Sequence, residues 1–291
     1  MTESFDGDWL ELREPFDAMA RDMGLAAQLS AALPARPRIL DLGAGTASLT
    51  RWLGHAIGRA QAWTLVDADP ELITRAFDTL AERADLIGWA SSFPNKRTLL
   101  IHAPHGAWRI EALLTNLALA PHGLPLQQMD AVVCSALCDL VSEDWITRMA
   151  EACAARRIPF YAALNTSAPA RFSPPHRGDA FVRRGFMRDQ LRDKGFGGRA
   201  LGDAAPAAIA RAFAAHGYTV HSAPSPWRIG RLDGEMAEAL SSGMLQAAAK
   251  HERTAARVLD AWAEVRADQI EAARLNILVP HRDVLALPPG A

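Results

Sequence analysis

Two short segments in the first quarter of the chain combine glycine and aspartate in a pattern that suits nucleotide binding. Residues 38–46 read Arg-Ile-Leu-Asp-Leu-Gly-Ala-Gly-Thr, an apolar strand that runs into a turn at Gly43 and Gly45. Glycine lets a backbone turn sharply and approach a ligand with no Cβ in the way. A second apolar strand over 62–66 ends at Asp67, 22 residues after Gly45. A carboxylate at about this spacing of roughly 20 residues can accept hydrogen bonds from both hydroxyls of a ribose.

The elements that must position these residues alternate between apolar strands and amphipathic helices. Further strands are expected at 98–101, 108–114, 130–137, 159–164, 218–222, 273–279 and 284–287, with 108–114 as the third parallel strand. This alternation predicts an α/β fold with an open, mostly parallel sheet and helices on both of its faces. Ligands bind such sheets at the carboxyl ends of the strands. The residues expected on that rim are Gly43, Gly45, Asp67, Ser135, Asp139 and Asn165.

The chain is expected to form a single domain with four parts. Residues 1–35 carry two helical patterns and form an N-terminal cap, which could act as a lid, and residues 36–165 form the ligand-binding core. Residues 166–205 are rich in proline and glycine, which indicates a long functional loop. Residues 206–291 complete the sheet and contain a helical insertion over 235–272.

Composition excludes several classes of protein. The 291 residues are 49% hydrophobic and 22% charged with a net charge of −2, which is typical of a globular protein and disfavours nucleic acid as the main partner. The three cysteines, Cys134, Cys138 and Cys153, lack paired zinc-site spacing, and the histidines show no ligand spacing, so no metal is expected. With no apolar run of about 18 residues and no signal peptide, we expect a cytoplasmic protein without membrane segments. Nothing in the sequence indicates an oligomeric state.

The glycine turn and the segments around it resemble a known family. Residues 39–46 look like motif I of the class I S-adenosylmethionine-dependent methyltransferases. Residues 66–71 are similar to the end of that family's second strand, and 130–135 to its fourth-strand block. The resemblance covers roughly 36–165 and implies a doubly wound, mostly parallel seven-stranded sheet with S-adenosylmethionine as the cofactor. The C-terminal half carries no signature that defines the methyl acceptor.

The resemblance also implies roles for individual residues. Asp41 would lie near the methionine amino group, the glycine turn beneath the cofactor, and Asp67 at the ribose. Asn116 stands where the family often has an acid near the adenine amino group. The cofactor-binding residues expected on this basis are Asp41, Gly43, Ala44, Gly45, Asp67, Ala68, Asn116, Leu117 and Ser135.

The sequence gives weaker signals for the residues that would bind and deprotonate the methyl acceptor. An acceptor that must lose a proton needs a nearby base, and the candidates are Asp139, His176 and Asp179. Asp139 could equally cap the helix around Trp145, and a loop histidine is more often solvated. The basic segment 183–199 suggests Arg183, Arg184 and Lys194 as substrate-binding residues, although the same charges would suit a solvated face.

The favoured function is methyl transfer from S-adenosylmethionine to a small polar or anionic acceptor. Three alternatives remain: an RNA methyltransferase, a nicotinamide-dependent oxidoreductase and a non-catalytic cofactor-binding subunit. The basic segment permits the first. The second is disfavoured because Ser48 occupies the third glycine position of the dinucleotide motif and no Tyr-x-x-x-Lys pair is present. Turnover with methyl-labelled cofactor would separate the third from an enzyme.

Overall fold

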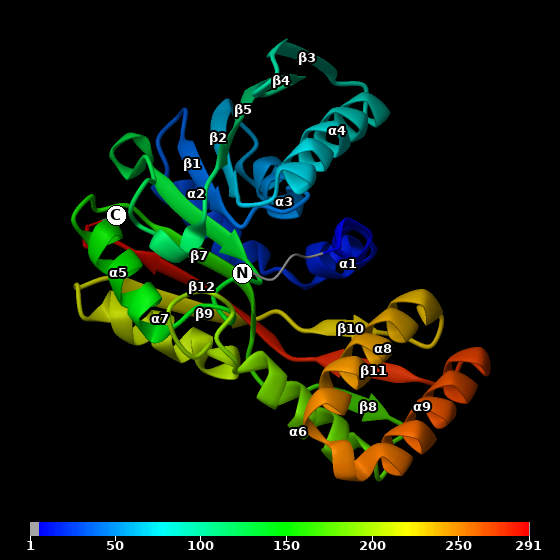
Figure 1. Ribbon diagram of the computed structural model, residues 1–291. Coiled ribbons are helices and arrows are strands. Elements are labelled where there is room, and N and C mark those ends of the chain that lie inside the picture. Colours follow the sequence, from blue (N-terminus) through cyan, green and yellow to red (C-terminus); the bar gives the residue numbers. More distant parts are fainter. Residues whose placement is uncertain (1–5, 291) are drawn as a thin grey trace.

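A nine-stranded sheet forms the centre of the protein, seen here in a computed structural model that describes residues 6–290 (Figure 1). Its order is β3-β4-β5-β2-β1-β6-β7-β12-β9. The strands are β1 (Arg38–Leu42), β2 (Gln61–Asp67), β3 (Ala90–Asn95), β4 (Thr98–Ala103), β5 (Gly106–Leu114), β6 (Ala131–Ser135), β7 (Phe160–Thr166), β9 (Thr219–Pro224) and β12 (His281–Leu287).

The five central strands, β5-β2-β1-β6-β7, are parallel, and β12 runs antiparallel between β7 and β9. The expectation of a mostly parallel, doubly wound sheet is confirmed, but the number of seven strands is wrong. The two extra strands, β3 and β4, extend the β5 edge as antiparallel neighbours. Most of β3 is exposed, so the segment Ala-Ser-Ser-Phe-Pro-Asn has no apolar alternation that would mark it as a strand.

Helices cover both faces of the parallel strands, because successive strand residues point to opposite faces. On one face lie α2 (Met23–Ala32), α3 (Ser48–Ile57) and α4 (Pro70–Leu86), which share a buried core with Ile39 and Trp63. On the other face α5 (Glu143–Ala154) and α7 (Ala205–Ala214) bury Trp145 and Phe213 against Leu40. Three short 3₁₀ turns, η1 (Leu117–Leu119), η2 (Leu126–Gln128) and η3 (Gly202–Ala204), lie in the connections.

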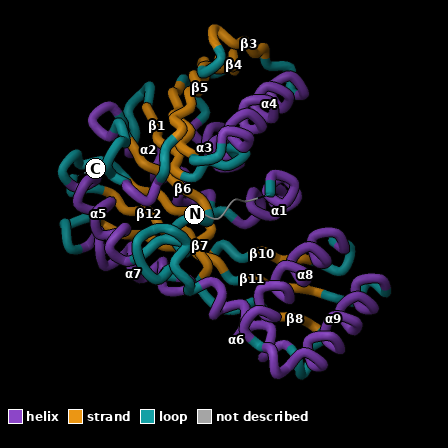
Figure 2. Tube along the Cα trace, viewed as in Figure 1, coloured by secondary structure: helices purple, strands orange, loops and turns teal. Residues whose placement is uncertain are grey.

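A smaller module projects from one end of the sheet (Figure 2). It contains the antiparallel sheet β10-β11-β8, formed by β8 (Arg171–Ser173), β10 (Trp227–Ile229) and β11 (Asn276–Val279). The helices α6 (Asp179–Gln190), α8 (Gly234–His251) and α9 (Ala256–Glu271), with the 3₁₀ turn η4 (Arg253–Ala255), complete it. Phe172, Val182, Met244 and Trp262 belong to its separate core. We call this unit the accessory module.

The accessory module corrects two expectations. The segment 166–205 is not one long loop, because it contains β8, α6 and η3. Gly185 in the middle of α6 reads as a helix breaker, but a Cβ there would lie 2.7 Å from the Cα of Ala248, so glycine permits close contact between α6 and α8. The strand expected over 273–279 begins only at Asn276 and pairs within the small sheet, and β12 takes the place in the central sheet.

Helix α1 (Gly7–Ala20) lies between the central sheet and the accessory module (Figure 1). Asp6 caps its start by accepting a hydrogen bond from the backbone N–H of Asp8. Trp9, Leu12 and Phe16 pack against the accessory core. Among residues 6–290, no helix is both long and apolar enough to cross a membrane.

Candidate functional site

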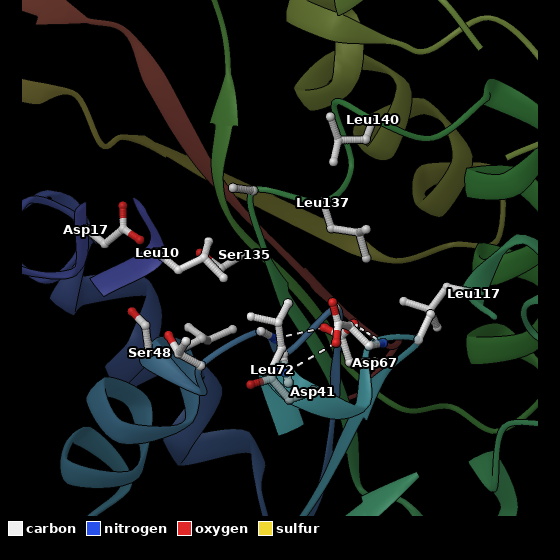
Figure 3. A pocket seen from close by; sticks show the side chains of 18 of the residues that line it. Leu10, Asp17, Asp41, Ser48, Asp67, Leu72, Leu117, Ser135, Leu137 and Leu140 are labelled. Atoms are coloured by element: carbon white, nitrogen blue, oxygen red, sulfur yellow. Dashed lines mark hydrogen bonds between the residues drawn. The ribbon is translucent and has the colours of Figure 1, made fainter. Parts of the chain in front are cut away.

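A cavity of about 540 Å³ opens at the carboxyl ends of β1, β2 and β6. This is the point where the strand order reverses, which is where open α/β sheets bind ligands. The glycine turn after β1 and Asp67 at the end of β2 line this cavity. Helix α1 and the residue that caps its end add Leu10, Arg13, Asp17 and Arg21. In Figure 3 the side chains of Asp41 and Asp67 lie in the lower part of the view, with Leu117 to their right and Leu137 above them. We call this space the first cavity.

The turn between β1 and α3 needs its glycines. Gly43 and Gly45 have φ angles of +62° and +53°, a region that residues with a Cβ seldom enter. A Cβ on Gly45 would also lie 3.0 Å from Cδ1 of Leu10 on helix α1. The turn therefore keeps its backbone open to the first cavity, and Ala44 lines the cavity between the two glycines.

Asp67 is held by the backbone on both sides. Its Oδ2 accepts a 2.9 Å hydrogen bond from the N–H of Gly45, and its Oδ1 accepts a 3.1 Å bond from the N–H of Asp69. Burial raises the pKa of this carboxyl, and the backbone hydrogen bonds oppose that rise. A carboxylate has about four acceptor positions, so acceptor capacity remains for a ligand. Asp67 and its neighbour Ala68 both line the first cavity.

Asp41 lies deeper, with 1% of its surface exposed. Oγ1 of Thr50 donates a 2.7 Å hydrogen bond to its Oδ2, so helix α3 fixes this carboxyl near the end of β1. Burial raises the pKa of Asp41 to about 7, while the Thr50 hydrogen bond and the charge of Arg21 act in the opposite direction. The first cavity thus contains an acid that can change its charge near neutral pH.

Arg21 is a cavity residue that the sequence analysis missed. It is 4% exposed, and its guanidinium donates 3.1 Å hydrogen bonds to the hydroxyls of Ser48 and Ser135. Asp17, one helical turn earlier, lies 3.6 Å away. The Nε of Arg21 is buried and has no hydrogen-bond partner among the described residues. The available signal was the Asp17–Arg21 spacing of four residues at the end of an expected helix.

Only one of the two cofactor-binding residues expected after the third strand, Asn116 and Leu117, lines the first cavity. Leu117 lines the first cavity, but Asn116 does not. Asn116 is exposed, and its side-chain oxygen accepts a 2.9 Å hydrogen bond from the N–H of Ala118, which caps η1. The expectation that Asn116 contacts the cofactor is therefore not supported by its position, because its amide serves the local turn.

A second cavity, of about 620 Å³, adjoins the first between the central sheet and the accessory module. Arg13, Ala136, Leu140 and Lys194 line both spaces. Asp139 lines the second cavity and accepts a 2.8 Å hydrogen bond from Oγ1 of Thr166. It does not cap the helix around Trp145, because that position belongs to Ser142, whose Oγ accepts from the N–H of Trp145.

His176 and Asp179 lie outside both cavities and have structural partners. Asp179 is 5% exposed, accepts a 2.7 Å hydrogen bond from Nε1 of Trp262 and forms a buried ion pair with Arg266. Nδ1 of His176 accepts a 3.1 Å hydrogen bond from the N–H of Gly178 at the start of α6. Their positions do not support the expected role as bases, because neither side chain lines a cavity and Asp179 connects α6 to α9 inside the accessory module.

The basic segment 183–199 is largely neutralised. Arg184 and Arg188 pair with Glu252 at 2.6 and 2.9 Å, and Lys194 lies 3.6 Å from Asp189. Arg184 lines neither cavity, so its expected substrate contact is not supported. Arg183 lines the second cavity and Lys194 lines both. Most of the positive charge that made RNA a possible partner is therefore paired with carboxylates of the same chain.

Comparisons with known proteins give limited sequence overlap. No family model matches the chain. A stretch of 53 residues is 49% identical to the biotin biosynthesis bifunctional protein BioCD of Bordetella avium (strain 197N), which is 18% of this chain and 11% of that protein. The chain therefore matches only about a tenth of that relative's length.

Similar solved structures span most of the chain at low identity. A cyclopropane-fatty-acyl-phospholipid synthase-like protein from Lactobacillus casei ATCC 334 is 15% identical with a TM-score of 0.48, over 95% of this chain and 100% of that one. The cyclopropane synthase MmaA2 from Mycobacterium tuberculosis is 11% identical with a TM-score of 0.44, over 91% and 82%. The mycolic acid cyclopropane synthase CmaA1, solved with SAH and CTAB, is 11% identical with a TM-score of 0.43, over 91% and 83%.

Proposed function

We propose that this protein transfers a methyl group from S-adenosylmethionine to a small-molecule acceptor. The observation that carries the proposal is the carboxylate of Asp67, fixed by the N–H of Gly45 at the edge of the first cavity. The two oxygens of one rigid carboxylate match the two vicinal hydroxyls of a ribose. The topology supports the proposal, because the cavity lies at the strand switch point.

The remaining walls suit the other parts of this cofactor. Asp41 is a carboxyl that could accept from the ammonium group of the methionine portion, and Arg21 supplies a buried cation with an unpartnered Nε for its carboxylate. The apolar side chains of Leu117 and Leu137 offer a surface for the adenine ring. The Gly45 backbone leaves open the space that a Cβ would take. These residues fit the cofactor by charge, shape and hydrogen-bonding capacity.

Bound at this site, the sulfonium of the cofactor would supply an electrophilic methyl group. Such a displacement needs little acid–base chemistry, so the chain contributes mainly alignment and exclusion of water. Asp67, Asp41 and Arg21 would fix the position of the sulfur by holding groups on both sides of it. Helix α1, which covers the cavity with Leu10 and Arg13, would exclude solvent.

Calorimetric titration with S-adenosylhomocysteine tests the proposal. We expect the wild-type protein to bind it in the micromolar range and Asp67→Asn to weaken binding at least tenfold, because one acceptor and the charge are lost. Asp78→Asn is the matched control, since Asp78 is exposed on α4 and lines neither cavity. Absence of binding, or equal binding by wild type and Asp67→Asn, would contradict the proposal.

A further inference from the structure

The second cavity contains more apolar surface than a polar acceptor alone requires. Its accessory-module side presents large apolar side chains from α6, α8 and β11, and helix α1 adds an indole. The members of this apolar wall are Trp9, Phe186, Met187, Leu240, Met244 and Val279. A cavity of this size with such a wall is typical of a site for an organic molecule with a substantial apolar body.

The lining of the same cavity includes a carboxylate with an unsatisfied acceptor atom. Asp139 is 8% exposed and its Oδ2 is held by Thr166, but Oδ1 is buried without a partner among the described residues. Leaving a buried carboxylate oxygen unpaired is costly, so such an atom calls for an explanation. A ligand group that donates a hydrogen bond to Oδ1 would provide one.

The charges around the second cavity favour a donor group over an anion at that position. Arg13 pairs with Asp17 at 3.1 Å, and Lys194 and Lys250 lie 3.6 and 4.0 Å from Asp189. Each of these three cations thus has a carboxylate partner, and Lys194 and Lys250 share one. An anionic group beside Asp139 would place two negative charges together in a buried site, which is unfavourable.

We propose that the second cavity binds the methyl acceptor as an amphipathic molecule, with its apolar body on the apolar wall and a hydroxyl or amino group donating to Oδ1 of Asp139. This inference rests on the proposed function. It places the nucleophilic atom beside Ala136 and Leu140, which line both cavities. As the nucleophile's lone pair forms the new bond to the methyl carbon, the carbon–sulfur bond breaks, its electron pair stays on sulfur, and the acceptor's proton passes to Asp139.

The apolar part of the inference can be tested with simple alcohols. Trp9 and Trp227 line the second cavity, so their fluorescence reports its occupation. We expect protein saturated with S-adenosylhomocysteine to bind 1-pentanol, 1-heptanol and 1-nonanol with an affinity that rises about fourfold per added methylene, corresponding to about 0.8 kcal/mol each.

A cavity-filling variant shows where the alcohols bind. Gly243 on α8 lines the second cavity, and no heavy atom lies within 4 Å of a Cβ built there. Gly243→Phe has room for its Cβ, so its ring should occupy part of the cavity and reduce 1-nonanol affinity at least tenfold. Glu238→Phe is the matched control, because Glu238 is exposed on the same helix and lines neither cavity. Equal 1-nonanol affinity in Gly243→Phe and wild type would overturn the inference.

The polar part is tested with two isomers, 1-nonanol and methyl octyl ether, which have the same atoms but differ in the donor hydroxyl. At pH 8 we expect the wild type to prefer the alcohol about tenfold and Asp139→Ala to lose this preference. Asp139→Asn, which keeps the side-chain shape, should retain only part of it. An unchanged preference in both variants would overturn the role of Asp139.

Titration of S-adenosylhomocysteine with the same samples separates the two proposals. Failure of that ligand to bind would count against the methyltransferase function itself. Failure of 1-nonanol to bind a protein that does bind S-adenosylhomocysteine would overturn only the amphipathic acceptor site.

Discussion

The backbone N–H of Gly45 lies 2.9 Å from Oδ2 of Asp67, so the turn after β1 and the carboxylate after β2 hold each other in place. The two residues are 22 positions apart and meet because β1 and β2 are parallel neighbours, with Leu42 beside Val66. The carboxylate is thereby oriented before any ligand arrives. A site ordered in advance loses less conformational entropy when it binds.

Replacing Gly45 should damage this arrangement in two ways. Gly45→Ala places a Cβ at positive φ and 3.0 Å from Leu10, so we expect a loss of about 1 to 2 kcal/mol in unfolding free energy and at least tenfold weaker S-adenosylhomocysteine binding. Gly88→Ala is the control, since Gly88 also has positive φ, at +76°, but has nothing within 4 Å. It should lose stability without losing affinity. Urea unfolding and calorimetry measure the two effects.

Asp41 should make stability depend on pH. Burial raises its pKa from 3.8 to about 7, so between about pH 4 and pH 7 the folded protein holds a proton that the unfolded chain has released. The Asp41 contribution to stability therefore falls as pH rises through this range and is constant above it.

The variant Asp41→Asn isolates that contribution. From pH 5 to pH 8 its unfolding free energy should improve relative to wild type by about 2 to 3 kcal/mol, because the wild type loses about 1.4 kcal/mol for each pH step of one between the two pKa values of Asp41. Urea denaturation at both pH values measures this difference. Asp78→Asn, at an exposed position, should show none. A pH-independent difference between Asp41→Asn and wild type would mean that Asp41 is already ionised at pH 5.

Arg21 should contribute to the affinity for the cofactor. Arg21→Met keeps an unbranched stem but removes the donors to Ser48 and Ser135. We expect S-adenosylhomocysteine affinity to fall at least tenfold, as for a lost hydrogen bond to a charged group. Arg36→Met, at an exposed residue before β1, is the control. Unchanged affinity in Arg21→Met would exclude a contact between Arg21 and the ligand.

Asp179 should prove structural. Asp179→Asn leaves Arg266 buried without its counter-charge, which typically lowers the unfolding free energy by about 3 to 5 kcal/mol. The affinity for S-adenosylhomocysteine should not change under conditions in which the variant is fully folded. The exposed pair of Arg211 and Glu143 provides the comparison, since Glu143→Gln should cost less than about 1 kcal/mol. Thermal unfolding and calorimetry distinguish these outcomes. Loss of affinity in folded Asp179→Asn would return this residue to the functional site.

The central sheet was predictable because its signals are local. Ile39, Leu40 and Leu42 form an apolar run, and such a run marks a strand covered on both faces. The β3 strand could not be found this way, because it is exposed and gains its strand geometry from pairing with β4. Helix α6 was hidden for a different reason, since Gly185 is explained only by the contact with Ala248.

Some residues of the candidate site could likewise be located from local sequence patterns, whereas others are revealed only by the packing of the folded chain. Asp41 and Asp67 could be located because each lies at or next to the end of a recognisable strand, and strand ends meet at one rim. Arg21 reaches the same cavity through the packing of α1, and its four-residue spacing from Asp17 does not reveal that packing. Asp179 has the residue type of a base, but only its distant partner Arg266 reveals that it is structural.

Helix α1 forms part of the wall of both cavities through Arg13, while Trp9 also lies on the apolar wall and packs against the accessory core. A displacement of this helix that admits one ligand therefore alters the walls around the other. The two ligands should accordingly change each other's affinity by the same factor, as thermodynamic linkage requires. One helix would then make occupancy of the donor cavity and the acceptor cavity mutually dependent.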